Sequence, residues 1–300
     1  MRSADRAAPE LQAAILDWYD AHGRRLTFRA STDPYGVLVS EVMAQQTQIS
    51  RVLEAWSSFL AAFPTIAALA AAEPADVLRA WRGLGYNRRA LNLWRAARIV
   101  VDEFDGELPR DLGALEGLPG VGRYTARAVA AFAFAMPVGP VDTNVRRVLG
   151  RAVGGARDAF AGRALQVVAD ASVPAARAAD WTHALMDVGA TICRPVPRCD
   201  ECPARRACRY AATGGADELR PAARRTMTPF RETSRWLRGR ILDQLRDGSG
   251  WVTLAERIGS HDRAAIENAL AALATEGLAE RDADDPLIAR LPVASVGAAG

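Results

Sequence analysis

Apolar residues recur at helical spacing through almost all of the first two thirds of this chain. Residues 9–24 place Leu11 and Ile15 on one helical face, and the long stretch 35–63 keeps the same periodicity. The alternation of apolar and polar residues that is typical of strands does not compete before residue 215. The pattern therefore predicts an all-α domain of about ten helices.

One pair of these predicted helices is joined by a short glycine turn. The segment "LGALEG" (112–117) precedes "LPGVG" (118–122), and the helical run "RYTARAVAAFAF" follows. We expect Gly120 and Gly122 to adopt positive φ and to let a ligand approach the backbone closely. The unpaired N–H groups at the start of the second helix suit a phosphate. An ordinary αα-hairpin is the alternative that the short motif leaves open.

A carboxylate follows this hairpin at the start of another predicted helix. Asp142 directly precedes "TNVRRVLGRAV" (143–153), where it can cap the helix. Beside a phosphate-binding turn, it can also stabilise an oxocarbenium charge that develops on a sugar, as carboxylates do in glycoside hydrolysis. Both roles are compatible with its position.

The four cysteines of the chain are clustered with the spacing C-x5-C-x2-C-x5-C. They are Cys193, Cys199, Cys202 and Cys208. Such clustering favours an intracellular metal site over a disulfide framework. Four thiolates on one short loop suit a 4Fe–4S cluster or a tetrahedral zinc ion. The cysteines alone leave a 4Fe–4S cluster, a zinc ion and disulfides open, and the family resemblance given below favours the 4Fe–4S cluster.

The charges of the chain are also informative. The formal net charge is only +3, which allows nucleic-acid binding without demanding it. All 38 basic residues are arginine, so no lysine amine can form a Schiff base. No apolar signal segment and no uncharged apolar run of transmembrane length occur in the sequence. We therefore expect neither a signal peptide nor a membrane span.

The last third of the chain reads as a linker and a small module. Residues 211–229 are rich in Gly, Pro, Ala and Arg, which is typical of a linker. Beyond them we expect helices over 234–248, 253–259 and 262–281, and a β-hairpin over 278–292. Three helices and a hairpin predict a winged-helix-like module at 230–300.

Taken together, these motifs resemble a known family. The hairpin with "VDTNVRRVL" resembles the helix–hairpin–helix, Gly/Pro-rich, Asp (HhH-GPD) DNA glycosylases of the endonuclease III superfamily. "SEVMAQQTQ" (40–48), "GLGYNRRALNL" (83–93) and "ALMDVGATIC" (184–193) look like the MutY branch of adenine glycosylases. The resemblance covers about residues 10–210. It implies a two-lobed glycosylase domain over 1–210 that includes an iron–sulfur loop at 193–208, and a shortened C-terminal region.

The residue at position 124 separates two branches of that superfamily. The endonuclease III branch resembles this hairpin but carries a lysine there, which attacks the sugar and gives lyase activity. Here Tyr124 takes its place, and a phenol cannot form an imine. The resemblance thus implies a monofunctional glycosylase without efficient lyase activity.

The same resemblance assigns further roles. Glu41 matches the glutamate that protonates N7 of the flipped adenine, and Asp142 matches the carboxylate that stabilises the sugar charge. Gln46, which we expect on the helix of Glu41, matches the residue that fills the gap left by the flipped base. Tyr86 matches the aromatic wedge beside the opposite base. The hairpin residues expected to contact DNA are Leu118, Gly120, Val121, Gly122 and Arg123. The residues expected at the base pocket are Phe28, Arg29, Ala44 and Asp187.

Three positions depart from the family pattern. Phe28 replaces a tryptophan, Ala44 replaces a leucine, and Thr143 replaces a glycine. The first two changes remove volume near the expected base pocket, and apolar fit alone discriminates bases by only about 1–3 kcal/mol. The chain after residue 230 is also too short and too helical for the Nudix-like domain with which MutY enzymes sense 8-oxoguanine.

The sequence therefore predicts a hydrolase that excises adenine mispaired with 8-oxoguanine or guanine from double-stranded DNA. We expect a cytoplasmic monomer at the bacterial nucleoid, with no membrane partner. A thymine or uracil mismatch glycosylase of the same fold is the first alternative, favoured by Phe28 and Ala44 and opposed by Glu41. A non-catalytic iron–sulfur protein that binds DNA or senses redox state is the second, and Glu41 with Asp142 opposes it.

Overall fold

The computed structural model describes residues 6–215 and 228–294. Their contacts divide the chain into two compact units, between which the chain passes more than once. Unit 1 comprises Met1–Glu41, Pro109–Gly117 and Val121–Pro221, and unit 2 comprises Val42–Leu108, Leu118–Gly120 and Ala222–Gly300. None of the helices in the described part is long and apolar enough to span a membrane.

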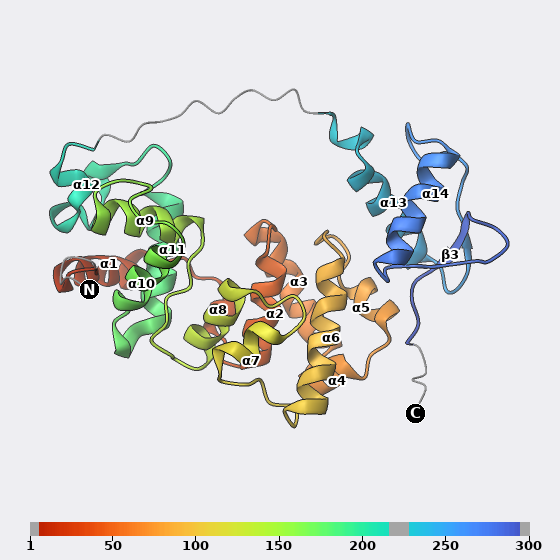
Figure 1. Ribbon diagram of the computed structural model, residues 1–300, viewed down its shortest axis with the longest axis horizontal. Coiled ribbons are helices and arrows are strands. Elements are labelled where there is room, and N and C mark those ends of the chain that lie inside the picture. The colour runs from red at the N-terminus through yellow and green to blue at the C-terminus, as the bar shows by residue number, and fades with distance from the viewer. Residues whose placement is uncertain (1–5, 216–227, 295–300) are drawn as a thin grey trace. The chain divides into compact units, whose positions relative to one another are not determined.

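Unit 1 is helical throughout its described part. Its elements are α1 (Pro9–His22), η2 (Thr27–Ala30), most of α2 (Pro34–Ala44), α7 (Leu112–Gly117), α8 (Arg123–Ala133), α9 (Thr143–Gly154), α10 (Gly162–Ala171), η3 (Ala175–Arg177), α11 (Ala178–Thr191), η4 (Cys199–Glu201), η5 (Arg205–Ala207) and α12 (Arg209–Ala212). Helix α11 packs on α1, α8 and α9 (Figure 1). Its residues Trp181, Ala184 and Leu185 are at most 2% exposed, so α11 forms the centre of this core.

Unit 2 begins with a second helical cluster. It contains α3 (Ile49–Ala62), α4 (Ile66–Ala70), α5 (Pro74–Ala80) and α6 (Arg88–Glu103). The apolar face of α6, which includes Leu91 and Val100, packs against α4 and α5. Trp81 is fully buried at the end of α5, where its ring meets Phe59 edge-on with centroids 5.7 Å apart. This packing fixes the start of the turn at 83–87.

The C-terminal segment of unit 2 mixes helices and strands. Its elements are η6 (Phe230–Glu232), α13 (Ser234–Asp247), β1 (Val252–Thr253), α14 (Arg263–Thr275), β2 (Glu280–Arg281) and β3 (Ile288–Arg290). Helices α13 and α14 pack together, and the strands form an antiparallel sheet in the order β1-β3-β2. Val252 pairs with Ala289, and Glu280 pairs with Arg290.

Two sequence expectations for this segment have different outcomes. The hairpin within 278–292 is confirmed as β2 and β3. The helix expected at 253–259 is wrong, because Val252 and Thr253 pair with β3 and Ile258 forms a bridge with His261. Most of the linker expected at 211–229 lies outside the described residues, although α12 extends into its start.

The apolar stretch 35–63 is two helices rather than one. Helix α2 ends at Ala44 and α3 begins at Ile49. Between them Gln46 adopts φ 57°, a left-handed conformation that no helix contains. The expectation that Gln46 shares a helix with Glu41 is therefore wrong.

Candidate active site

Glu41 lies on α2 with only 8% of its surface exposed. Burial raises the pKa of its carboxyl to about 7, because the charged form loses the hydration it has in water. A hydrogen bond from Tyr124 and the charge of Arg29 oppose this rise, whereas the charge of Asp142 adds to it. Near neutral pH this group can therefore hold or release a proton.

Tyr124, in the first turn of α8, is the hydrogen-bond partner of Glu41. Burial and the two nearby carboxylates, Glu41 and Asp142, hold the pKa of its phenol well above its usual value. The phenol therefore stays protonated and donates to the Glu41 carboxyl. The structure thus brings together Glu41, Tyr124 and Asp142, three side chains that lie far apart in the sequence.

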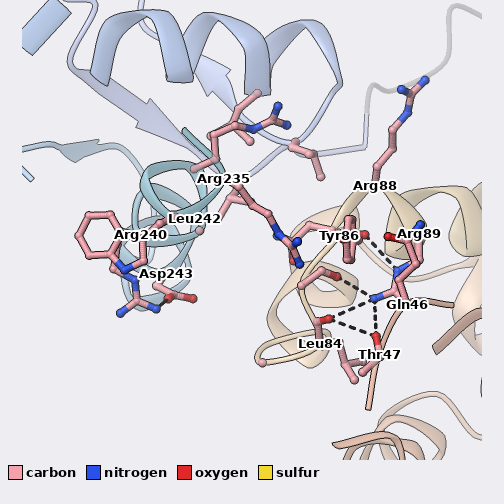
Figure 2. Close-up of a pocket in the computed structure, with 18 of the residues that line it drawn as sticks. Gln46, Thr47, Leu84, Tyr86, Arg88, Arg89, Arg235, Arg240, Leu242 and Asp243 are labelled. Carbon is pink, nitrogen blue, oxygen red and sulfur yellow. Dashed lines mark hydrogen bonds and ion pairs between the residues drawn. The ribbon is translucent and has the colours of Figure 1, made fainter. Parts of the chain in front are cut away.

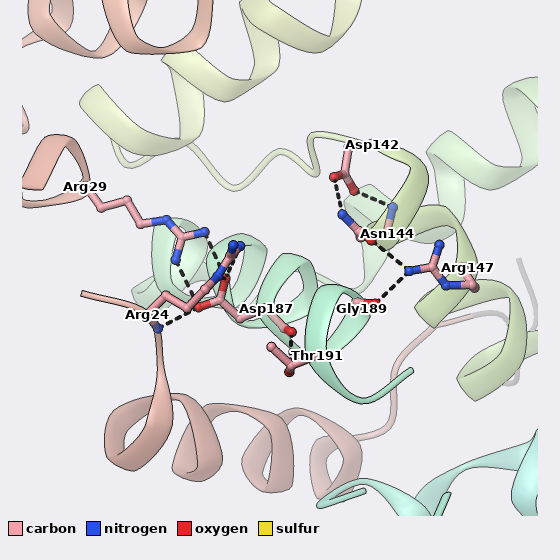
Figure 3. A network of polar contacts seen from close by, with 8 residues as sticks. All are labelled: Arg24, Arg29, Asp142, Asn144, Arg147, Asp187, Gly189 and Thr191. Atoms are coloured by element: carbon pink, nitrogen blue, oxygen red, sulfur yellow. Dashed lines mark hydrogen bonds and ion pairs between the residues drawn. The ribbon is translucent and has the colours of Figure 1, made fainter. Parts of the chain in front are cut away.

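Asp142 is the N-cap of α9. Its Oδ1 accepts from the backbone N–H groups of Asn144 at 2.8 Å and Val145 at 2.7 Å. Its Oδ2 accepts from the Asn144 side-chain amide at 3.0 Å (Figure 3). These bonds satisfy two N–H groups of the helix start and hold the carboxylate in one orientation. The capping role is confirmed, and it does not exclude a chemical one.

Unit 1 also contains a buried ion pair between Asp187 and Arg29. Asp187 on α11 has no exposed surface and accepts from Arg29 through both guanidinium nitrogens at 3.0 Å. Arg24 adds its backbone N–H at 2.8 Å and its Nε at 2.7 Å (Figure 3). Burial alone would raise the pKa of Asp187, but the hydrogen bonds from Arg29 and Arg24 outweigh it and lower the pKa. The pair orients Arg29, whose charge acts on Glu41.

The sequence did not point to Arg24 or to a further neighbour, His183. His183 is 8% exposed and its ring lies 4.2 Å from that of Phe132. Burial and the charge of Arg29 lower its pKa to about 3, so the imidazole is neutral at physiological pH. The spacing of His183 and Asp187 along α11 was the signal that could have placed both on one helical face.

The glycine hairpin has the expected form at one of its two glycines. Gly120 adopts φ 78° and packs so tightly that an added Cβ would lie 2.8 Å from the Cβ of Asn92. Gly122 instead has φ −88°, so the expected positive φ is wrong there. A Cβ at Gly122 would meet nothing within 4 Å, and no side chain caps the start of α8. The open N-terminus of α8 is thus accessible to a ligand.

The flanking hairpin residues differ in exposure. Leu118 and Val121 are buried at 3% and 4% exposure, and Arg123 is exposed at the start of α8. Leu118 and Val121 therefore anchor the turn.

Unit 2 holds the two residues expected to act on the DNA stack. Gln46 and Tyr86 are both exposed, and both adopt positive φ, 57° and 45°. Such conformations cost free energy in residues with side chains and persist only where the surroundings impose them. Both residues line one cleft of about 850 Å³ (Figure 2).

Arg89 imposes these two turns. Its guanidinium donates to the carbonyls of Val42 and Met43 at 2.8 Å and of Gln45 at 2.6 Å. It also donates to the carbonyls of Leu84 and Gly85 at 3.1 and 3.0 Å, and to the Thr47 hydroxyl at 3.0 Å (Figure 2). One side chain thus fixes the backbone of both turns. No pattern in the sequence distinguishes Arg89 from the other 37 arginines.

The four cysteines line a single small cavity in unit 1. All four are free thiols, so the disulfide alternative is not observed among the described residues. Arg147 donates to the Cys193 carbonyl at 2.6 Å, and Arg151 donates to the Arg194 carbonyl at 2.6 Å and to Cys193 Sγ at 3.5 Å. Across the described residues, the side chains as placed form no set of three or more ligands around one point.

Comparisons with known proteins identify the family. Residues 39–159 match the HhH-GPD superfamily of base excision DNA repair proteins. The adenine DNA glycosylase of Mycolicibacterium smegmatis is 45% identical over 275 residues, which cover 90% of this chain and 92% of that protein. The chain belongs to the adenine DNA glycosylase family. The resemblance inferred from the sequence motifs is therefore confirmed.

Solved structures support the fold of this adenine DNA glycosylase family member. A thermostable thymine-DNA glycosylase is 30% identical with a TM-score of 0.64, over 67% of this chain and 95% of that one. A trapped covalent complex of endonuclease III with DNA is 26% identical with a TM-score of 0.57, over 71% of this chain and 99% of that one.

The remaining predicted pocket residues lie in different surroundings. Phe28 is buried in η2 of unit 1, directly before Arg29. Ala44 is the last residue of α2 and is half-buried. Their roles at a base pocket stay predictions.

Proposed function

We propose that this chain is a monofunctional glycosylase that hydrolyses the N-glycosidic bond of adenine mispaired with 8-oxoguanine or guanine. The observation that carries the proposal is the buried carboxyl of Glu41, whose pKa of about 7 suits a general acid at neutral pH. Adenine leaves readily only when its ring is protonated. The adenine DNA glycosylase of M. smegmatis, similar over almost the whole chain, supports this choice of base.

In the proposed mechanism two carboxyl groups divide the work. Glu41 donates a proton to the adenine ring at N7, and Tyr124 holds that carboxyl through its phenol hydrogen bond. As the bond to the base breaks, positive charge develops on the sugar, and Asp142 stabilises it. The hydrogen bonds from Asn144 and Val145 fix the carboxylate before the charge forms, so little reorganisation is needed. Water then adds to the sugar, and Glu41 accepts its proton.

The absence of lysine supports a reaction without strand cleavage. Tyr124 cannot form an imine, and the sequence contains no side-chain amine. Borohydride should therefore trap no more than a trace of covalent adduct with DNA that contains an abasic site. A Tyr124→Lys variant is the matched control, and it should give a clear adduct. Strong trapping by the unaltered chain would contradict the monofunctional assignment.

The other site residues are assigned by the family resemblance and by their surroundings. Arg29, Asp187, Phe28 and Ala44 keep the base-pocket roles that the family resemblance implies. The open start of α8 at Gly122 and Arg123, with the turn from Leu118 through Gly120 and Val121, is proposed to bind a DNA phosphate. Gln46 and Tyr86 are proposed to fill the gap and wedge the stack. The proposed partner is mismatched double-stranded DNA, bound by a cytoplasmic monomer at the nucleoid.

We also propose that the loop 193–208 holds a 4Fe–4S cluster. Four free thiols around one small cavity are a suitable donor set, and Cys193, Cys199, Cys202 and Cys208 would be its ligands. The cluster would hold the loop in shape, and Arg147 and Arg151 tie the loop to α9. Absorbance at about 400 nm that is lost in a Cys202→Ser variant would support it. Colourless protein that contains stoichiometric zinc would support the zinc alternative.

The domain organisation is part of the same proposal. We assign residues 1–210 to the glycosylase domain, 211–229 to a linker and 230–300 to a winged-helix-like module. Two helices and the three-stranded sheet of the last segment support the module.

The deciding experiment compares four duplexes. Adenine opposite 8-oxoguanine, adenine opposite guanine, thymine opposite guanine and uracil opposite guanine are incubated with the protein and then treated with alkali. We expect breaks at adenine. Breaks only at thymine or uracil would favour the second candidate, a mismatch pyrimidine glycosylase. The similarity to a thymine-DNA glycosylase structure, with the smaller Phe28 and Ala44, is the observation behind that candidate.

A further inference from the structure

The cleft in unit 2 has two walls from distant parts of the sequence. One wall is formed by the turns that carry Gln46 and Tyr86. The other wall is formed by α13 and includes Ser234, Arg235 and Leu242 (Figure 2). The last segment of the chain therefore completes a surface that begins at the proposed wedge.

Helix α13 is firmly attached beside that wedge. The side chain of Arg246 is only 3% exposed, and it donates to the Leu78 carbonyl at 2.9 Å and to Asn87 Oδ1 at 2.5 Å. Asp243 neutralises its charge at 3.0 Å. Because Asn87 directly follows Tyr86, this contact fixes α13 against the wedge turn itself. The α13 wall is thus a built part of the cleft.

The arginines of the cleft divide into two groups. Arg238 is paired with Glu276, Arg240 with Asp243, and the guanidinium of Arg89 is occupied by backbone carbonyls. A second group consists of exposed arginines for which the described residues offer no carboxylate partner. These are Arg51 on α3, Arg88 at the start of α6 and Arg235 on α13. Unpaired guanidinium groups gathered around one cleft suit phosphate oxygens, which they bind with two parallel hydrogen bonds.

Arg235 also reaches the wedge residue. Its guanidinium carbon lies 4.1 Å from the centroid of the Tyr86 ring, within the range of a cation–π contact. A phosphate bound by Arg235 would therefore lie next to the base that Tyr86 contacts. The proposed function places Tyr86 beside the base opposite the target. The phosphate bound by Arg235 would therefore belong to the strand opposite the excised base.

We propose that this cleft binds the phosphodiester backbone of the DNA strand opposite the excised base, with Arg51, Arg88 and Arg235 as its phosphate ligands. The inference rests on the proposed function for the position of that strand. It gives α13 a direct part in DNA recognition. The cleft places arginines next to an aromatic ring. A nucleic acid, which carries a phosphodiester beside each base, fits this arrangement better than an acidic peptide does.

The test neutralises single phosphates. Binding of the full chain is measured on duplexes whose target nucleoside carries a 2′-fluoro group, which resists oxocarbenium formation. Methylphosphonates replace one phosphate at a time in either strand. We expect some replacement opposite the target to weaken binding of the unaltered chain, and Arg235→Ala to weaken it about tenfold. The same replacement should not weaken the binding of the Arg235→Ala variant any further. Replacements in the target strand should weaken binding by the same factor in the variant and in the unaltered chain.

Arg281→Ala is the matched control, because Arg281 is an exposed arginine of the same segment that does not line the cleft. It should leave affinity and the salt dependence unchanged, whereas Arg235→Ala should reduce the salt slope by about one. The proposal would be overturned if the loss of binding free energy caused by Arg235→Ala were additive with that of every phosphate replacement in both strands. It would also be overturned if an acidic peptide bound through Arg235 without displacing DNA. If adenine excision fails in the unaltered chain while this coupling persists, the proposed function is wrong and the cleft assignment stands.

Discussion

At the residue scale, the surroundings of Glu41 link activity to stability. The carboxyl is buried with a pKa of about 7, against an ordinary value of 4.5. The folded chain therefore binds this proton more tightly than the unfolded chain does. Folding loses stability through this group as the pH rises from about 4.5 to about 7, and the loss stays constant above that range.

A Glu41→Gln variant tests both consequences. Adenine excision should fall by about 10²–10⁴, because a general acid contributes about that factor. The variant should nevertheless unfold at a higher temperature than the unaltered chain at pH 8, and the difference should shrink as the pH falls to 5. Thermal unfolding at several pH values measures it. A pH-independent difference would show that burial does not set the proton affinity of Glu41.

Asp187 gives a second prediction at this scale. An Asp187→Asn change leaves Arg29 without its buried counter-charge, and breaking a buried pair costs about 3–5 kcal/mol. Urea unfolding should detect this loss. The control is Asp158→Asn, which removes an exposed partner of Arg146 and should cost less than about 1 kcal/mol. Equal effects of the two changes would contradict the structural role of Asp187.

The residues of the site could be predicted from the sequence only in part. Motif resemblance selected Glu41, Tyr124 and Asp142, which the structure brings together. Arg24 and Arg89 escaped notice because an arginine is recognised as a structural hydrogen-bond donor only by what surrounds it. Such contacts join residues far apart in the sequence, and local patterns do not encode them.

At the element scale, the turn between α2 and α3 shows why a helical pattern can mislead. Residues 35–63 contain no proline or glycine at the break, so periodicity alone predicts continuity. The helix ends because Arg89 binds the carbonyls of Val42, Met43 and Gln45. The helix prediction for residues 253–259 was wrong for a related reason, because pairing with β3 replaced the helix that the local sequence favoured. In both cases tertiary contacts outweighed local propensity.

Arg89→Lys tests that explanation. A lysine keeps the charge but has no planar fork, so it cannot satisfy the carbonyls of both turns. We expect the free energy of unfolding to fall by about 2–4 kcal/mol, because buried carbonyls lose their donors. Hydrogen exchange of the amides in 44–48 and 83–88 should also accelerate. Exchange that is unchanged in both turns would mean that Arg89 does not hold them.

At the scale of the whole molecule, the proposed steps are divided between the two units. The groups that would break the glycosidic bond, Glu41 and Asp142, belong to unit 1. The residues that would keep the stack open, Gln46 and Tyr86, belong to unit 2. The chain connects the units more than once, so under this proposal one enzyme would act on two different features of the DNA.

This division predicts that chemistry and base extrusion can be impaired separately. Extruding a base costs a few kcal/mol when it is paired and less when it has no partner. Tyr86→Ala should therefore slow single-turnover excision of adenine opposite guanine by about 10- to 100-fold, and much less when adenine faces an abasic site. Asp142→Asn should slow both reactions equally, because it acts after extrusion. If each variant slows excision by the same factor on both duplexes, Tyr86 does not act as a wedge. A wedge should become dispensable once the target base has no pairing partner to leave.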